Sequence, residues 1–97
     1  MVTSRVKFSM GRLITTCGVA DKMEQDGGFR AFVSKSLGRH AEGDWGDVCA
    51  NDKAANNKAL KINERVLSAY EIPGLPKIWI ITERDRSVTT VLFPEEY

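Results

Sequence analysis

The chain has 97 residues, of which 42% are hydrophobic and 28% are charged, and 14 basic residues against 13 acidic ones leave a net charge of +1. A chain of this length buries a single core and is expected to form one domain. The balanced charge argues against a nucleic-acid binder with a basic face and against an acidic mimic of DNA, so direct nucleic-acid binding is not favoured. No apolar stretch approaches the roughly 18 residues of a membrane span and no signal-peptide core is visible, which predicts a cytoplasmic protein that does not enter a membrane.

The two cysteines, Cys17 and Cys49, are far apart in the sequence and form no C-x-x-C pair. In a reducing cytoplasm, cysteines of this kind are usually packed in the interior as small apolar side chains. We therefore expect two packing thiols rather than a disulfide. No metal and no other cofactor is expected.

We expect residues 1–9 to form a short leader that can be flexible. Residues 10–97 are expected to form a single domain. Residues 12–17 are rich in β-branched side chains and predict a strand. Residues 20–25 can form one or two helical turns, which the Gly27-Gly28 pair would end.

The clearest helix follows, and its expected end is Gly43. Apolar and small side chains recur at the spacing of a single helical stripe, formed by Phe29, Phe32, Val33, Ser36, Leu37 and His40. A Gly/Asp turn over residues 43–47 comes next. Asn51 or Asp52 can then cap a second helix that runs to about Lys61. The expected inner face of that helix consists of Asp52, Ala55, Asn56, Ala59 and Leu60.

The last third predicts a three-stranded antiparallel meander, with strands over residues 65–72, 77–82 and 87–93. The middle strand is apolar on both faces, which is typical of a strand covered on both sides. The predicted fold is therefore α+β: one domain with an N-terminal strand, two main helices and this meander. The expected core consists of Leu13, Phe29, Phe32, Val33, Leu37, Leu60, Leu67, Ile78, Ile80, Val91 and Phe93.

His40 is the only histidine of the chain. One interpretation makes it a general base or metal ligand beside Asp44 and Asp47. The other makes it a hydrogen-bonded histidine at a helix end, and its place on the apolar stripe favours this second interpretation. Asp44, Asp47 and Asp52, with Asn56, could hold a hard cation, but their spacing is not that of an EF-hand, and turns and caps need the same residue types.

A structural polar cluster is the expectation that the residues themselves support best. Asp52 and Asn56 share a helical face with small alanines, and if that face is buried both need hydrogen-bond partners. Arg65 and the loop of residues 83–86, which begins with Glu83, supply candidates, with an arginine as the natural partner of Asp52. A structural network is favoured here over a ligand site.

Trp45 lies in the polar Gly/Asp turn, where an indole either fills the core or lies exposed. We favour a core position for Trp45. Trp79 is flanked by isoleucines and is also assigned to the core. Because exposed tryptophans are enriched in binding hot spots, Trp45 is nevertheless one of the candidate partner-binding residues. The complete candidate set is Trp45, Asp44, Asp47, Arg84, Asp85 and Arg86.

Three runs of the sequence together carry a resemblance to a known group of proteins. They are H-A-E-G-D-W-G-D over residues 40–47, K-I-W-I-I-T-E over residues 77–83 and P-E-E-Y over residues 94–97. The combined pattern, which extends over about residues 11–97, resembles a family of small bacterial proteins labelled plasmid-related or hypothetical that travel on mobile elements. Arg84 departs from the pattern, since the relatives often have a bulkier residue there.

The resemblance implies a bacterial, phage or plasmid origin and brings no activity or site residue with it. Small mobile-element proteins commonly act by binding host or rival machinery. The predicted function is therefore that of a non-enzymatic protein-binding protein, an inhibitor of a bacterial defence complex of the anti-CRISPR or anti-restriction class. The alternative is a small metal-dependent hydrolase or nuclease built from His40 with Asp44, Asp47 and Asp52. The oligomeric state is left open.

Overall fold

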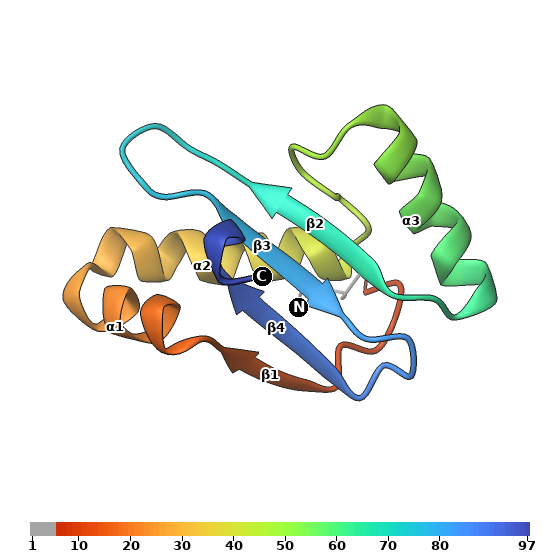
Figure 1. Cartoon of the computed structure of the whole chain (residues 1–97), viewed down its shortest axis with the longest axis horizontal. Coiled ribbons are helices and arrows are strands. Elements are labelled where there is room, and N and C mark those ends of the chain that lie inside the picture. Colours follow the sequence, from red (N-terminus) through yellow and green to blue (C-terminus); the bar gives the residue numbers. More distant parts are fainter. Residues whose placement is uncertain (1–5) are drawn as a thin grey trace, which may run out of the picture.

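A four-stranded sheet with the strand order β1-β4-β3-β2 organises the chain (Figure 1). The computed structural model describes residues 6–97, and its strands are β1 (Arg12–Thr15), β2 (Val66–Tyr70), β3 (Ile78–Thr82) and β4 (Val88–Leu92). Strands β2, β3 and β4 form the predicted antiparallel meander. Strand β1 adds to it beside β4 and parallel to it, so the α+β class is confirmed but the sheet is mixed and wider than the meander alone.

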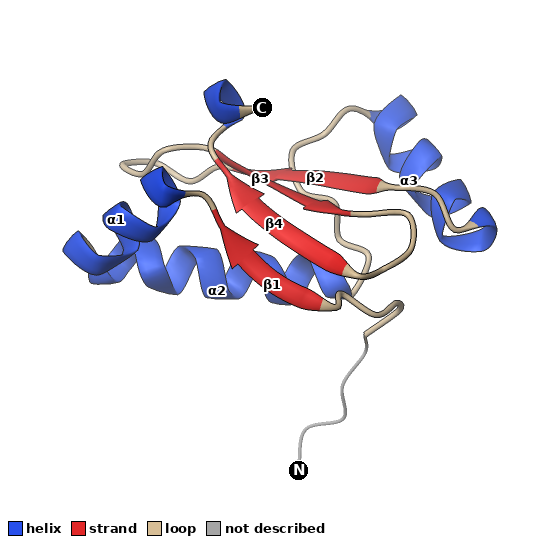
Figure 2. Cartoon of the chain, turned by 60° about the horizontal axis from the view of Figure 1, so that its bottom comes forward, coloured by secondary structure: helices blue, strands red, loops and turns tan. Residues whose placement is uncertain are grey.

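The helices of the described part are α1 (Cys17–Gln25), α2 (Gly27–Ala41), α3 (Ala50–Ile62) and the short 3₁₀ helix η1 (Pro94–Glu96). Helices α1 and α2 cover one face of the sheet, whereas α3 lies beyond the outer edge of β2 (Figure 2). Helix α1 starts earlier than predicted because the Thr16 hydroxyl caps it, accepting from the Val19 N–H at 3.3 Å. No helix formed by residues 6–97 has the length and apolar character needed to cross a bilayer.

The main core lies between the two covering helices and the sheet. The predicted stripe of α2 is buried there, and the sheet contributes Tyr70, Ile78, Ile80 and Val91. Leu37, Leu60, Leu67 and Phe93 are half-buried. The assignment of Leu13 to the core is wrong: its side chain is 52% exposed because β1 is the edge strand of the sheet.

A second, smaller core joins α3 to the sheet through Trp45, Ala59 and Val66. Phe8 packs against this cluster, and the Lys7 N–H donates to the Ala41 carbonyl at 2.8 Å. Lys7 and Phe8, which fall within the expected leader, therefore contact the domain. The remainder of the expected leader, residues 1–5, lies outside the described residues.

The outer edge of β2 is closed by hydrogen bonds to its main chain. The Asn56 side chain of α3 donates to the Leu67 carbonyl at 2.7 Å and accepts from the Leu67 N–H at 3.2 Å. Two residues along, the Ala69 N–H donates to the Trp45 carbonyl and the Ala69 carbonyl accepts from the Asp47 N–H at 2.7 Å. Gly46 is required between them because a Cβ there would meet the Ala69 oxygen at 2.0 Å.

Helix α3 is fastened at its other end by Arg86 of the β3–β4 loop. The Arg86 guanidinium donates to the main-chain oxygens of Glu64 at 2.7 Å and Ala59 at 3.3 Å, which lie at the C-terminal end of α3. A guanidinium at this end satisfies free carbonyls and also interacts favourably with the helix dipole. In addition to the second core, the sheet and α3 are thus joined by the Asn56 amide at the strand edge and by the Arg86 guanidinium at the helix end.

The clamp formed by Asn56 predicts the result of removing it. Asn56→Ala leaves the Leu67 N–H and C=O without their partner, and we expect the free energy of unfolding to fall by about 1–3 kcal/mol. Asp52→Ala is the matched control, because Asp52 lies on the same helix but is exposed, and it should cost less than about 1 kcal/mol. Urea denaturation of both variants measures the difference. Equal losses would show that Asn56 does not hold the edge.

Candidate functional site

His40 lies in the last turn of α2 and is completely buried, with 0% of its surface exposed. Its Nδ1 atom is hydrogen-bonded to the Ser68 hydroxyl of β2. Its Nε2 atom lies 2.9 Å from the Thr82 hydroxyl of β3. The rings of Phe8 and Trp45 meet the imidazole edge-on, with centroids at 5.4 and 5.6 Å. At this site the imidazole therefore makes two hydrogen bonds to hydroxyl groups and two contacts with aromatic rings.

The hydrogen bonds beyond Thr82 determine where the protons are. The Thr89 hydroxyl donates to the Met10 carbonyl at 2.7 Å, so it can only accept from Thr82, whose hydroxyl lies 2.6 Å away. Thr82 then has no proton left for His40, and Nε2 must be the donor. His40 is therefore the Nε2–H tautomer, and its Nδ1 lone pair accepts the proton of the Ser68 hydroxyl.

Burial, with the nearby positive charge of Arg86 acting in the same direction, lowers the pKa of His40 to about 4. The imidazole is therefore neutral at pH 7. A serine hydroxyl that donates to a neutral imidazole is the arrangement of an activated nucleophile. Here, however, Ser68 is as completely buried as His40, so a substrate has no access to either group. The arrangement is a structural network that joins α2 to three strands.

The buried neutral imidazole predicts a dependence of stability on pH. Because the folded pKa is about 4 and the ordinary value is 6.5, the unfolded state binds more protons between these values. The stability contributed by neutral His40 is complete above pH 6.5 and is lost as the pH falls towards 4. Between pH 7 and pH 5 the free energy of unfolding should fall by about 2 kcal/mol, measured by urea denaturation.

The carboxylates whose pKa values are shifted do not titrate between pH 5 and pH 7 and so do not affect this measurement. The pKa values of Asp26, Asp44 and Asp85 are all lowered, by hydrogen bonds to the Phe29 N–H, the Arg39 guanidinium and the Ser87 side chain respectively, so they titrate below the pH window. In His40→Gln the difference between pH 7 and pH 5 should shrink to less than about 0.5 kcal/mol. A difference of unchanged size in that variant would assign the effect to another group.

The acidic residues of the turn do not form a metal site with His40. The Asp44 carboxylate is paired with the Arg39 guanidinium at 2.7 and 3.2 Å, which lowers the pKa of that carboxyl. Asp47 and Asp52 are exposed, and both ring nitrogens of His40 are occupied by hydroxyls. Within residues 6–97 no group of three or more histidine, cysteine or acidic side chains could hold a metal ion. The residues of the hydrolase alternative are not brought together.

The candidate partner-binding residues fall into two groups: Trp45 and Arg86 are engaged within the fold, and the other four are exposed. Trp45 is only 3% exposed, and its indole N–H donates to the Asn57 side chain at 2.9 Å, so the core interpretation of this residue fits its position. Arg86 is committed to the end of α3. The others, Asp44, Asp47, Arg84 and Asp85, are exposed, and Arg84 forms an ion pair with Glu64 at 3.0 Å. The surface members therefore lie on two separate loops and share no aromatic anchor.

The predicted polar cluster is also rearranged. Asn56 and Arg86 do fasten α3 to the sheet, and Glu83 takes part through its carbonyl, which accepts from Arg86 at 3.1 Å. Asp52 points to solvent and forms no ion pair within residues 6–97, and Arg65 lies elsewhere, against Tyr97. The expected packing role of the thiols is wrong: the cysteines, Cys17 and Cys49, are both free and exposed at the starts of α1 and α3.

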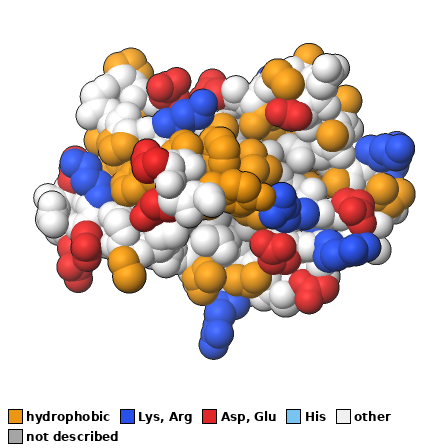
Figure 3. Space-filling view, viewed as in Figure 1, with side chains coloured by type: hydrophobic (Ala, Val, Ile, Leu, Met, Phe, Trp, Pro, Cys, Tyr) orange, Lys and Arg blue, Asp and Glu red, His pale blue; other side chains and the backbone are white. Residues whose placement is uncertain are grey.

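The face of the sheet that α1 and α2 leave uncovered carries mainly apolar side chains. Along each strand these alternate with the core residues, and we call this surface the helix-free face. Figure 3 shows hydrophobic side chains gathered at its centre with charged side chains around them. Its strand residues, read from the register, are Ile14, Leu67, Ala69, Trp79, Ile81, Thr90 and Leu92. Ile14 is exposed, Leu67, Trp79 and Thr90 are half-buried, and Ala69, Ile81 and Leu92 are buried.

An aromatic stack lies on the helix-free face. The rings of Trp79 and Tyr97 meet edge-to-face with centroids 5.6 Å apart, and Tyr97 is 65% exposed. The Arg65 guanidinium carbon lies 5.6 Å from the centre of the Tyr97 ring, and Arg65 donates to the Tyr97 hydroxyl at 2.7 Å. Arginine and aromatic rings in such contact are the side chains most enriched in protein-binding hot spots. We call Arg65, Trp79 and Tyr97 the aromatic stack.

One feature of the sequence, the apolar run over residues 78–81, relates to this surface. Residues 78–81 are apolar on both faces, which predicts that both faces are covered, and Trp79 was accordingly assigned to the core. In the structure only the face with Ile78 and Ile80 is covered by helices, and Trp79 is half-buried. The second apolar face of this strand therefore has no covering helix.

No family model, no curated protein sequence and no solved structure matches the chain. The assignment of a function therefore depends on the geometry described above.

Proposed function

We propose that this chain is a non-enzymatic protein-binding protein and that its helix-free face is the surface that contacts the partner. The observation that carries the proposal is the aromatic stack of Arg65, Trp79 and Tyr97 on an apolar sheet face without a covering helix. Apolar surface of this kind, surrounded by charged side chains, is typical of protein-binding sites.

The distribution of polar chemistry supports the same proposal. The one imidazole of the chain is buried with both nitrogens occupied, and the acidic residues of the turn are exposed and dispersed. An enzyme needs reactive groups that meet at a cavity open to a substrate. A binding protein needs only a surface, and the helix-free face provides one.

The proposed partner is a component of a bacterial defence complex, which the chain would inhibit as an anti-CRISPR or anti-restriction protein. This part of the proposal is supported by the resemblance to small proteins of mobile elements, which commonly act by binding rival machinery. Small size suits such a role, because a short chain can block a larger assembly by covering one of its surfaces.

The proposal predicts that changes on the helix-free face abolish binding without unfolding the protein. Purified CRISPR effector and restriction complexes are tested for binding by biolayer interferometry, and any complex that binds is tested in an interference assay. Tyr97→Ala removes the exposed ring and should weaken binding by about tenfold or more. Thr90→Glu places a charge within the apolar face and should have at least the same effect.

Ile62→Ala is the control for these variants. Ile62 is 55% exposed but lies at the end of α3, away from the helix-free face, so its loss should leave the affinity unchanged. The absence of binding and of inhibition across several CRISPR and restriction types would contradict the proposed partner. Binding that survives both Tyr97→Ala and Thr90→Glu would contradict the proposed surface.

A further inference from the structure

The two edges of the sheet differ in how their main-chain groups are used. Strands β1 and β2 form the edges. On the β2 edge, the outward N–H and C=O groups of Leu67 and Ala69 are all hydrogen-bonded, to Asn56 and to the main chain around Gly46. Proteins commonly block an edge strand in this way, because free strand groups attract another strand.

The β1 edge is open. The N–H of Arg12 donates to the Ser87 carbonyl at 3.0 Å and the N–H of Thr16 to the Val91 carbonyl at 3.1 Å, so these residues direct their main-chain groups towards β4. Successive residues of a strand direct these groups to opposite sides, and those of Leu13 and Thr15 therefore point away from the sheet. Within residues 6–97 no group bonds to them, and all residues of β1 are exposed.

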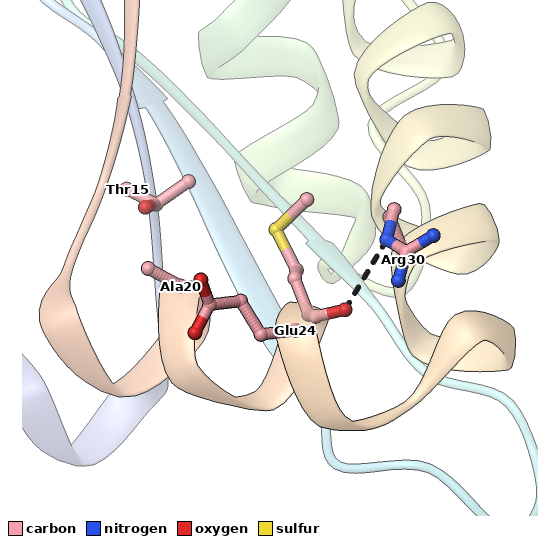
Figure 4. Close-up of a pocket in the computed structure, with 5 residues that line it drawn as sticks. Thr15, Ala20, Glu24 and Arg30 are labelled. Atoms are coloured by element: carbon pink, nitrogen blue, oxygen red, sulfur yellow. Dashed lines mark hydrogen bonds between the residues drawn. The ribbon is translucent and has the colours of Figure 1, made fainter.

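A groove lies beside this open edge, between the end of β1, helix α1 and the start of α2 (Figure 4). It has a volume of about 680 Å³ and is lined by Thr15, Ala20, Met23, Glu24 and Arg30. Arg30 is held in place by its Nε–H, which donates to the Met23 carbonyl at 3.2 Å. The lining combines apolar surface from Ala20 and Met23 with one charge of each sign.

The edge and the groove share a residue and face the same way. Thr15 pairs with Val91, a core residue, so its side chain lies on the helix-covered side of the sheet where the groove is. A strand added beside β1 would place alternate side chains on that same side. One of these side chains would therefore enter the groove while the main chain pairs with Leu13 and Thr15.

We infer that the β1 edge and this groove together bind an extended peptide segment of a partner protein by strand addition. The inference rests on the proposed function and names a further contact of the same partner. Main-chain hydrogen bonds to an edge give such complexes affinity, and a pocket for alternate side chains gives them specificity. The apolar lining selects an aliphatic side chain. The exposed cation Arg12, three residues before Thr15 on β1, selects a carboxylate about three residues along the peptide from that side chain.

A second copy of this chain fits the edge less well than a peptide does. Its β1 would offer only a four-residue strand, and such a contact buries far less than the roughly 1,200 Å² of a stable protein interface. Pairing of two β1 strands would also leave the groove of each copy without an occupant. An extended peptide fills both the edge and the groove.

The test begins with a random peptide library displayed on phage and panned against the full chain. Enriched peptides are synthesised and their contacts are mapped by amide chemical shifts. The inference predicts peptides with an acidic residue about three positions from an aliphatic one, and shifts at Leu13, Thr15 and Ala20. Thr15→Pro removes an outward N–H, which an edge strand tolerates, and should weaken binding by about tenfold or more.

Ala20→Trp gives a second variant, because it fills the groove from an exposed position on α1 and should also weaken binding by about tenfold. Its matched control is Ala54→Trp, which adds the same ring to an exposed alanine of α3 and should change nothing. Peptides whose affinity is unaffected by both Thr15→Pro and Ala20→Trp would overturn the inference, as would a library that yields no peptide.

These experiments distinguish failure of the strand-addition inference from failure of the proposed function. Peptide shifts confined to Trp79 and Tyr97 would overturn the strand-addition inference while leaving the helix-free face as the binding surface. A dimer detected by light scattering and lost in Thr15→Pro would show that the edge pairs with a second copy instead, and would also overturn it. Loss of partner binding in Tyr97→Ala with peptide binding retained would support both.

Discussion

His40 holds one donated and one accepted hydrogen bond at a position with no exposed surface, and these two bonds join α2 to the sheet. Its contacts connect α2 to β2 and β3, and the threonine hydroxyls extend the connection through β4 to Met10. Every buried polar side-chain atom of the described residues has a partner, as the low dielectric of an interior requires. Changing any one of these groups would leave another unpaired.

This network explains why the His40 imidazole and the Ser68 hydroxyl are out of reach of a substrate. The imidazole and the hydroxyls of Ser68 and Thr82 hold α2 against the strands, and the rings of Phe8 and Trp45 contact the imidazole. What the fold leaves available is the opposite face of the sheet and one of its two edges. The aromatic stack lies on that face, and the open main-chain groups of β1 lie on that edge. Both features are the basis of the proposed recognition of another protein.

The parts of the fold that depend on local periodicity could be predicted from the sequence. The stripe from Phe29 to His40 fixed the buried side of α2, and the predicted meander is present with nearly the predicted strands. The parallel pairing of β1 with β4 could not be predicted, because it joins residues more than 70 positions apart and a short β-branched run does not reveal whether it lies at an edge. The core assignment of Leu13 failed for this reason.

The site was harder to predict for a related reason. Asp52 and Asn56 share a helical face, and only the path of β2 decides that Asn56 meets the strand while Asp52 remains in solvent. The partners of His40 lie 28 and 42 positions away, so its place on the apolar stripe indicated burial but not the hydroxyls that make burial possible. Arg65 was expected to be a partner of Asp52, and only the position of Tyr97 reveals that it belongs to the helix-free face instead.

The state of the His40 ring tests the account most directly, and the chain contains no other histidine to complicate the spectrum. Long-range ¹H–¹⁵N correlation spectra of uniformly labelled protein report which ring nitrogen carries the proton. The account predicts the neutral Nε2–H tautomer at pH 7, unchanged at pH 5.5, with an Nε2 proton that exchanges slowly with water. An imidazole that titrates near its ordinary pKa of 6.5, or one protonated at Nδ1 instead, would contradict a sealed structural network and would reopen the case for chemistry at His40.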